Sequence, residues 1–137
     1  MGGDTDIEPA DIDVETVEFD GVRTRVTRVQ TAASEHAPRA FVLIAGIGVA
    51  ATYFDLLAPT LAQQARVYAL DLPGFAGQRA PHSEPSVAFF ADQVEAVLDR
   101  FGLDDPVLLG HSFGTQILTE VLTRRPGIRH AVLIGPV

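Results

Sequence analysis

One serine of the sequence stands in a pattern that suits nucleophilic catalysis. Ser112 is the middle residue of Gly110-His111-Ser112-Phe113-Gly114, which follows the apolar run 107–109 and precedes an amphipathic stretch. A strand that turns into a helix within so few residues forces the serine into a sparsely allowed backbone conformation and exposes its hydroxyl at the edge of a sheet. Because side chains at both glycine positions would collide with neighbouring elements, we expect this turn, the serine elbow, to require Gly110 and Gly114. The pattern predicts Ser112 as a nucleophile, and the alternative is a serine that only caps a helix.

Composition and charge narrow the functional classes. The chain has 137 residues, 47% of them hydrophobic, and a formal net charge of −8. Eight acidic residues and no basic ones fall within residues 1–20, so the rest of the chain, with ten of each sign, is neutral. A neutral body without lysine disfavours a nucleic-acid partner, and the lack of cysteine excludes a thiolate metal site and a cysteine nucleophile. The sequence shows no signal peptide and no stretch that could span a bilayer, which predicts a cytoplasmic protein without a membrane partner.

The order of the expected elements predicts an α/β fold in a single domain. Residues 1–13 are expected to form an acidic, disordered tail, and residues 14–137 one domain. Two β-rich runs, 14–19 and 22–29, are joined by Asp20-Gly21, which is a strong signal for a two-residue hairpin. The elements expected after the hairpin alternate: strand 41–45, helix 52–64, strand 66–70, helix 86–101, strand 107–109, a helix to residue 125 and strand 130–134. Such alternation predicts a mostly parallel sheet with helices on both faces.

Three segments, in this order along the chain, resemble loops of the α/β-hydrolase superfamily. Gly46-Ile47-Gly48 resembles the oxyanion loop after its third strand, residues 69–78 are similar to the loop after its fourth strand, and the serine elbow looks like its nucleophile elbow. The resemblance covers about residues 14–137 and corresponds to strands 1–6 of that fold, opening with the antiparallel hairpin.

The resemblance implies a serine hydrolase that forms an acyl-enzyme on an ester-like carbonyl of a small-molecule substrate, without a metal or a cofactor. On this resemblance, the backbone amides of Ile47 and Phe113 would bind the oxyanion, with Gly46 beside them. Ala45 stands where the family usually has histidine, which puts the conformation of the oxyanion loop in question but not its amide. The sequence departs from the family's usual residues at four positions: Ala45, Phe75, Ala76 and Gln78.

The acid and the base that would complete a catalytic triad are not evident in the sequence. In this family the triad runs serine, acid, histidine along the chain, and after Ser112 only Glu120 and His130 remain. We expect Glu120 to lie about 12 Å along the helix, His130 to lie ~16 Å away at the opposite end of the sheet, and His111 to point away from the hydroxyl. The triad partners are therefore expected in strands absent from this chain, which would be inactive alone. Its last strand, 130–134, would then be an exposed edge prone to self-association.

Two other interpretations remain open at this point. Gly46-Ile47-Gly48-Val49-Ala50-Ala51 fits a dinucleotide-binding fingerprint between a strand and a helix, and Asp71 ends the next strand, where a ribose-binding acid would lie. This alternative, an NAD(P)-binding oxidoreductase, leaves the serine elbow unexplained. The second alternative is a degenerate hydrolase that binds a ligand or a partner without catalysis, which the missing acid and base motivate.

Overall fold

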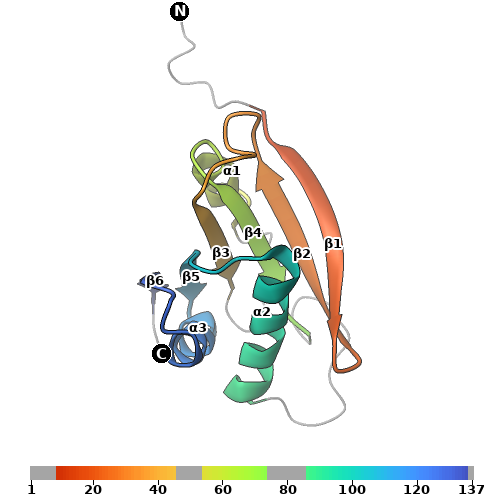
Figure 1. Ribbon diagram of the computed structural model, residues 1–137, viewed down its shortest axis with the longest axis vertical. Helices are drawn as coiled ribbons and strands as arrows, with labels where there is room; N and C mark the ends of the chain where they lie inside the picture. Colours follow the sequence, from red (N-terminus) through yellow and green to blue (C-terminus); the bar gives the residue numbers. More distant parts are fainter. Residues whose placement is uncertain (1–8, 46–53, 74–85, 136–137) are drawn as a thin grey trace, which may run out of the picture.

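A six-stranded sheet forms the centre of the molecule, with the strands in the order β1-β2-β4-β3-β5-β6 (Figure 1). The computed structural model describes residues 9–45, 54–73 and 86–135. The elements along the chain are β1 (Asp11–Phe19), β2 (Val22–Gln30), β3 (Ala40–Ile44), α1 (Leu57–Leu61), β4 (Arg66–Asp71), α2 (Val87–Phe101), β5 (Val107–His111), α3 (Phe113–Arg124) and β6 (His130–Ile134).

The first two strands form the predicted hairpin. They pair antiparallel along their whole length, and Asp20 and Gly21 take the two turn positions with φ of 55° and 77°. Positive φ at both positions matches the right-handed twist of the strands, which is why an Asp-Gly pair suits this turn. The tail predicted over residues 1–13 extends too far along the chain, because residues 11–13 pair with residues 28–30 and so belong to β1.

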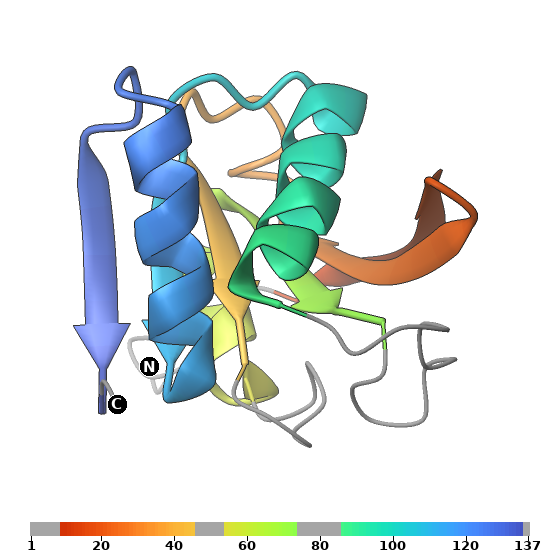
Figure 2. The same ribbon diagram turned by 90° about the horizontal axis from the view of Figure 1, so that it is seen from below.

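The parallel strands are covered by helices on both faces, as the sequence predicts. Figure 2 shows α2 and α3 side by side on one face of the sheet, and α1 covers the other. The alternation of β3 divides the core accordingly: Val42 and Ile44 pack in the α2–α3 cluster, whereas Leu43 and Ala45 pack in the α1 cluster. Because the chain leaves β3 for β4 on one side and later returns to β5 on the other, a crevice is expected where these strands end.

The helices begin and end where local signals place them, with one exception. Ser86 caps α2 by accepting a hydrogen bond from the amide of Phe89 at 3.1 Å, and Gly102 ends the helix at φ 65°. The helix predicted over 52–64 is wrong in length, since α1 spans only Leu57–Leu61. Pro59 explains its start, because a proline ring is tolerated only in the first turn of a helix. Within the described ranges, no helix is long and apolar enough to cross a membrane.

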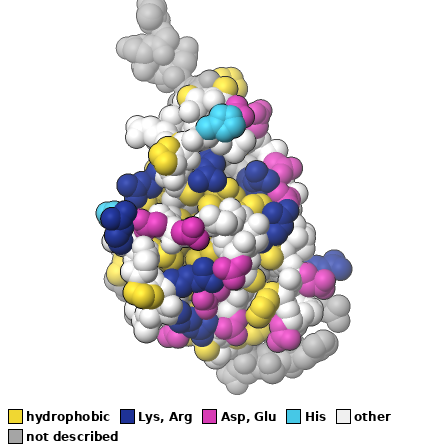
Figure 3. Space-filling model, viewed as in Figure 1, with side chains coloured by type: hydrophobic (Ala, Val, Ile, Leu, Met, Phe, Trp, Pro, Cys, Tyr) yellow, Lys and Arg dark blue, Asp and Glu magenta, His cyan; other side chains and the backbone are white. Residues whose placement is uncertain are grey.

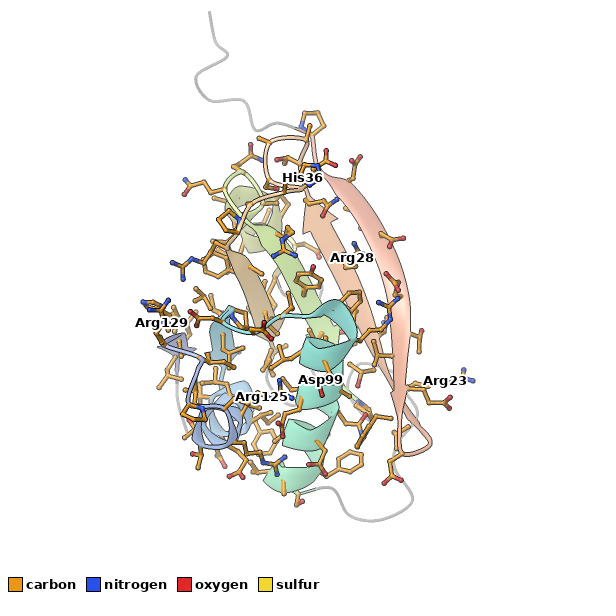
Figure 4. The ribbon with its side chains drawn as sticks, viewed as in Figure 1. Arg23, Arg28, His36, Asp99, Arg125 and Arg129 are labelled. Carbon is orange, nitrogen blue, oxygen red and sulfur yellow. The ribbon has the colours of Figure 1, made fainter. Side chains whose placement is uncertain are left out.

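Arginine–carboxylate pairs fasten α3, the helix that follows Ser112, to α2. The two arginines at the end of α3 hold three acids of α2: Arg124 contacts Asp92 at 2.6 Å and Glu95 at 2.8 Å, and Arg125 contacts Glu95 and Asp99 at 2.8 Å each. Arg125 and Asp99 are labelled in Figure 4, and Figure 3 shows basic and acidic side chains intermingled over this face. The pairs fix how α3 lies on α2, and through it the end of β5.

The edge strand β6 is exposed along its whole length. All five of its residues are exposed, including Val132 at 41%, Leu133 at 50% and Ile134 at 41%. The predicted apolar edge is therefore confirmed, and self-association through it stays a prediction.

The ion pairs of Glu95 give the α2–α3 contact a pH dependence. Burial acts to raise the pKa of Glu95, but hydrogen bonds and charges from Arg124 and Arg125 outweigh it and hold the pKa below 4.5. A lowered carboxyl pKa contributes stability that is complete above 4.5 and is lost as the pH falls through the folded-state pKa. We expect Glu95→Gln to lower the free energy of unfolding at neutral pH and to cost progressively less below pH 4.5, measured by urea denaturation.

The control for this prediction is Asp104→Asn, which changes an exposed acid in the turn after α2. This substitution is expected to change the free energy of unfolding only slightly at every pH. If the loss of unfolding free energy caused by Glu95→Gln does not change with pH, the lowered pKa of Glu95 is contradicted.

Candidate active site

Ser112 is the single residue between the end of β5 at His111 and the start of α3 at Phe113. Its backbone has φ 57° and ψ −122°. Among the described residues, the only other non-glycine residue with positive φ is Asp20, in the hairpin turn. A β-carbon in this region is sterically disfavoured, so the surrounding structure must hold the serine there. The strand–turn–helix geometry predicted for the serine elbow is confirmed.

The hydroxyl of Ser112 does not cap the helix that it precedes. Ser112 occupies the N-cap position of α3, yet its side chain makes no capping hydrogen bond. Ser86, at the same position of α2, has an extended backbone and does accept from an amide of the first turn. The capping interpretation of Ser112 is therefore wrong, and its side chain is half-buried.

The two elbow glycines stand where the backbone leaves no room for a side chain. A β-carbon at Gly110 would lie 2.8 Å from the carbonyl oxygen of Gly114 and against the side chain of Leu118. One at Gly114 would lie 2.9 Å from the carbonyl oxygen of Ala45 and against the backbone of Ile44. The collisions expected from the sequence are thus present, and they bring the first turn of α3 onto the end of β3.

The elbow lies at the carboxyl ends of two neighbouring parallel strands. Gly110 is paired with Ile44, the last residue of β3, and the amide of Ser112 donates to the carbonyl of Ile134 in β6 at 3.0 Å. Phe113 opens α3, so its amide belongs to the N-terminal group that cannot bond within the helix and lies at the positive end of the helix dipole. The other expected oxyanion residues, Gly46 and Ile47, lie outside the described residues.

The acid and the histidine that follow Ser112 are far from it, as predicted. Glu120 accepts a hydrogen bond from Arg124 at 3.0 Å in the later part of α3. His130 is paired with Val107, the first residue of β5, and so lies at the opposite end of that strand from the elbow. Neither side chain is placed to accept the proton of the Ser112 hydroxyl or to orient a base beside it.

The remaining histidines do not complete a triad within the described part of the chain. The side chain of His36 is 91% exposed in the loop between β2 and β3, where Figure 4 labels it, at the edge where β3 begins. His111 is the residue next to Ser112, and the alternation of β5 places its side chain on the same face as Leu109, toward the α1 cluster. His82 lies outside the described residues.

Asp71 has a structural partner at the end of β4. Its carboxylate is buried, with 3% of the residue exposed, and accepts hydrogen bonds from Nε and Nη2 of Arg25 at 3.0 and 2.9 Å. Arg25 and Asp71 stand opposite each other in the β2–β4 register. This pair anchors the start of the loop whose later residues, including Phe75, Ala76 and Gln78, lie outside the described residues.

One residue of the site has no signal in the sequence. Thr115, in the first turn of α3, donates to the carbonyl of Ser112 from its hydroxyl at 2.7 Å and from its amide at 3.0 Å. The residue is buried, with 3% of its surface exposed. A threonine three residues after the serine is common in helices, and only the folded structure reveals the contact.

Comparison with known proteins decides the family. The sequence pattern of the alpha/beta hydrolase fold matches residues 39–137. The chain belongs to the α/β-hydrolase fold family. The match includes the segment from Gly46 to Ala51, so membership of this family accounts for the glycine-rich sequence that also fits a dinucleotide fingerprint.

Relatives by sequence carry two kinds of name. The chain is 31% identical over 109 residues to the 1-acylglycerol-3-phosphate O-acyltransferase of Arabidopsis thaliana, covering 75% of this chain and 26% of that protein. It is 33% identical over 100 residues to the abhydrolase domain-containing protein abhd-5.2 of Caenorhabditis elegans, covering 69% of this chain and 22% of that protein. The chain thus spans about a quarter of the length of these relatives.

Solved structures show the same fold. The 2-hydroxy-6-oxo-6-phenylhexa-2,4-dienoate hydrolase of Rhodococcus sp. strain RHA1 superposes with a TM-score of 0.81 at 22% identity, over 94% of this chain and 48% of that one. An epoxide hydrolase from Vigna radiata superposes with a TM-score of 0.77 at 21% identity, over 89% of this chain and 39% of that one. At these identities the likeness concerns the fold alone.

The contact between Gly114 and β3 gives a direct test of the elbow. We expect Gly114→Ala to lower the free energy of unfolding by about 2 kcal/mol, because the added methyl group collides with backbone that cannot move without shifting a central strand. The matched control is Gly127→Ala, where a β-carbon meets nothing within 4 Å. Equal effects of the two substitutions in urea denaturation would contradict this packing.

The different use of the two N-cap serines gives a second test. Ser86→Ala should lower the free energy of unfolding by about 1 kcal/mol, because it removes a capping bond. Ser112→Ala should change it by less than about 0.5 kcal/mol in the destabilising direction, since no capping bond is lost. Both values come from the same denaturation experiment, and a loss at Ser112 as large as at Ser86 would restore the capping role.

Proposed function

We propose that the protein performs acyl chemistry on ester-like small-molecule substrates, with Ser112 as the nucleophile. The observation that carries the proposal is the state of this serine: a positive φ, no capping bond, and a place at the carboxyl ends of two neighbouring parallel strands. A conformation that costs on the order of 1–3 kcal/mol is retained where function requires it. Membership of the α/β-hydrolase fold family supports the same chemistry.

In the proposed reaction, Oγ of Ser112 attacks the carbonyl carbon of the ester while a base takes the hydroxyl proton. The carbonyl oxygen becomes an oxyanion that accepts a hydrogen bond from the amide of Phe113 and, we propose, a second from the amide of Ile47. The tetrahedral intermediate collapses, the base returns the proton to the departing alcohol, and an acyl group remains on Ser112. Water then attacks the acyl-enzyme through the same steps and releases the acid.

The base and its acid must come from outside the described residues. Glu120 and His130 are held away from the elbow, and a serine hydroxyl is a weak nucleophile until a base removes its proton. The proposal therefore assigns the nucleophile and not the whole triad.

A second candidate activity is transfer of the acyl group to an alcohol. It is favoured by the relative from Arabidopsis thaliana, which is named an O-acyltransferase. The acyl-enzyme at Ser112 is common to both activities, and only the acceptor differs: water for hydrolysis, a hydroxyl group for transfer. Product ratios with and without added glycerol-type alcohols distinguish the two.

A serine-directed fluorophosphonate probe tests the nucleophile. The intact protein should be labelled, the Ser112→Ala variant should not, and Ser86→Ala should be labelled at the wild-type rate because its hydroxyl only caps α2. Equal labelling of the intact protein and its Ser112→Ala variant would remove the assignment.

A further inference from the structure

We propose that Thr115 is a positioning residue whose hydroxyl aims the backbone amide of Phe113 at the oxyanion. The inference rests on the proposed function of Ser112 and adds a residue that the sequence pattern does not mark. Its basis is the pair of hydrogen bonds that Thr115 donates to the carbonyl oxygen of Ser112, at 2.7 Å from Oγ1 and 3.0 Å from the amide.

The geometry of the peptide group connects this carbonyl to the oxyanion donor. The carbonyl of Ser112 and the N–H of Phe113 belong to one planar peptide unit, and in a trans peptide they point in opposite directions. The described backbone contains no cis peptide bond. Fixing the oxygen of Ser112 therefore fixes the direction of the Phe113 hydrogen. A hydrogen bond accepted by the carbonyl also polarises the unit and makes that N–H a stronger donor.

The backbone of Ser112 needs such a constraint more than an ordinary residue does. Its positive φ is strained, and rotation of a flanking peptide plane is the simplest way to relax it. One plane is held by the hydrogen bond from the Ser112 amide to the carbonyl of Ile134 in β6 at 3.0 Å. Thr115 holds the other plane, and burial of the residue, only 3% exposed, limits the access of water to this part-buried bond.

Two further threonines of α3 make the ordinary hydrogen bond from a threonine hydroxyl to a carbonyl within a helix. Thr119 donates to the carbonyl of Thr115 at 2.7 Å, and Thr123 donates to the carbonyl of Thr119 at 3.0 Å. Both bonds reach back four residues within the helix, and the bond of Thr123 is exposed. Thr115 differs because it reaches the residue before the helix, where the backbone is strained. Thr123 is therefore a matched control.

The test compares Thr115→Val, Thr115→Ser and Thr123→Val with the wild-type protein. For each variant we would measure kcat and KM with a short-chain nitrophenyl ester, and the rate of labelling by the fluorophosphonate probe. Valine keeps the shape of threonine but removes the hydroxyl, so we expect kcat and the labelling rate to fall about tenfold, the value of one hydrogen bond felt in the transition state. We expect KM to stay within about twofold, because the oxyanion forms only after binding. Thr115→Ser should restore kcat, and Thr123→Val should leave it unchanged.

Three outcomes would overturn the inference, and they differ from failure of the proposed function. If Thr115→Val keeps kcat within about twofold while Ser112→Ala is inactive, the nucleophile stands and the positioning role does not. If Thr115→Val and Thr115→Ser lose kcat equally, the site responds to any change of this side chain, and the loss is not specific to the hydroxyl. If KM rises while kcat is kept, Thr115 acts on substrate binding. Only activity retained by Ser112→Ala would remove the proposed function itself.

Discussion

The close approach of Gly114 to the end of β3 is the constraint on which the site depends. With no side chain between them, the first turn of α3 rests on the carbonyl groups of Ile44 and Ala45. Gly110 makes the same approach possible from β5, because a side chain there would strike Gly114 and Leu118. These contacts set the separation between the serine elbow and the strand that leads into the segment with Ile47. In an acyl-transfer site, that separation decides whether two amides can reach one oxyanion, which needs donors at about 2.7–3.1 Å.

The strain at Ser112 is held by contacts on every side of the elbow. The residue is bonded to β6 through its amide and to Thr115 through its carbonyl. Behind it, Ile117, Leu118 and Val121 bury one face of α3 against the sheet, and the arginines at the far end of the helix hold α2. A strained backbone at a cost on the order of 1–3 kcal/mol persists only when surrounding structure determines it this strongly. With the backbone held at this φ, the side chain of Ser112 makes no capping bond to α3.

Features set by neighbouring residues could be predicted from the sequence, and those set by residues far apart could not. Asp20-Gly21 predicts the hairpin because both residues tolerate positive φ, and the two elbow glycines predict the turn because any β-carbon there would collide. The length of α1 was overestimated, since the periodic apolar residues already include Phe54, ahead of the point where Pro59 allows the helix to start. The Arg25–Asp71 pair joins residues 46 apart, and its existence depends on the β2–β4 register. Thr115 shows the same limit at short range, because its role follows from the backbone angles of another residue.

Hydrolysis and acyl transfer make the same demands on the residues described here. Both need the hydroxyl of Ser112 free of the helix, an amide at the start of α3, and a fixed peptide plane between them. They differ only in the second half of the reaction, where water or an alcohol approaches the acyl group. The difference between the two activities would therefore lie in residues that contact the acceptor, and not in the elbow. An elbow of this kind is consistent with relatives of either name, because the proposed acyl-enzyme is common to hydrolysis and transfer and only its acceptor differs.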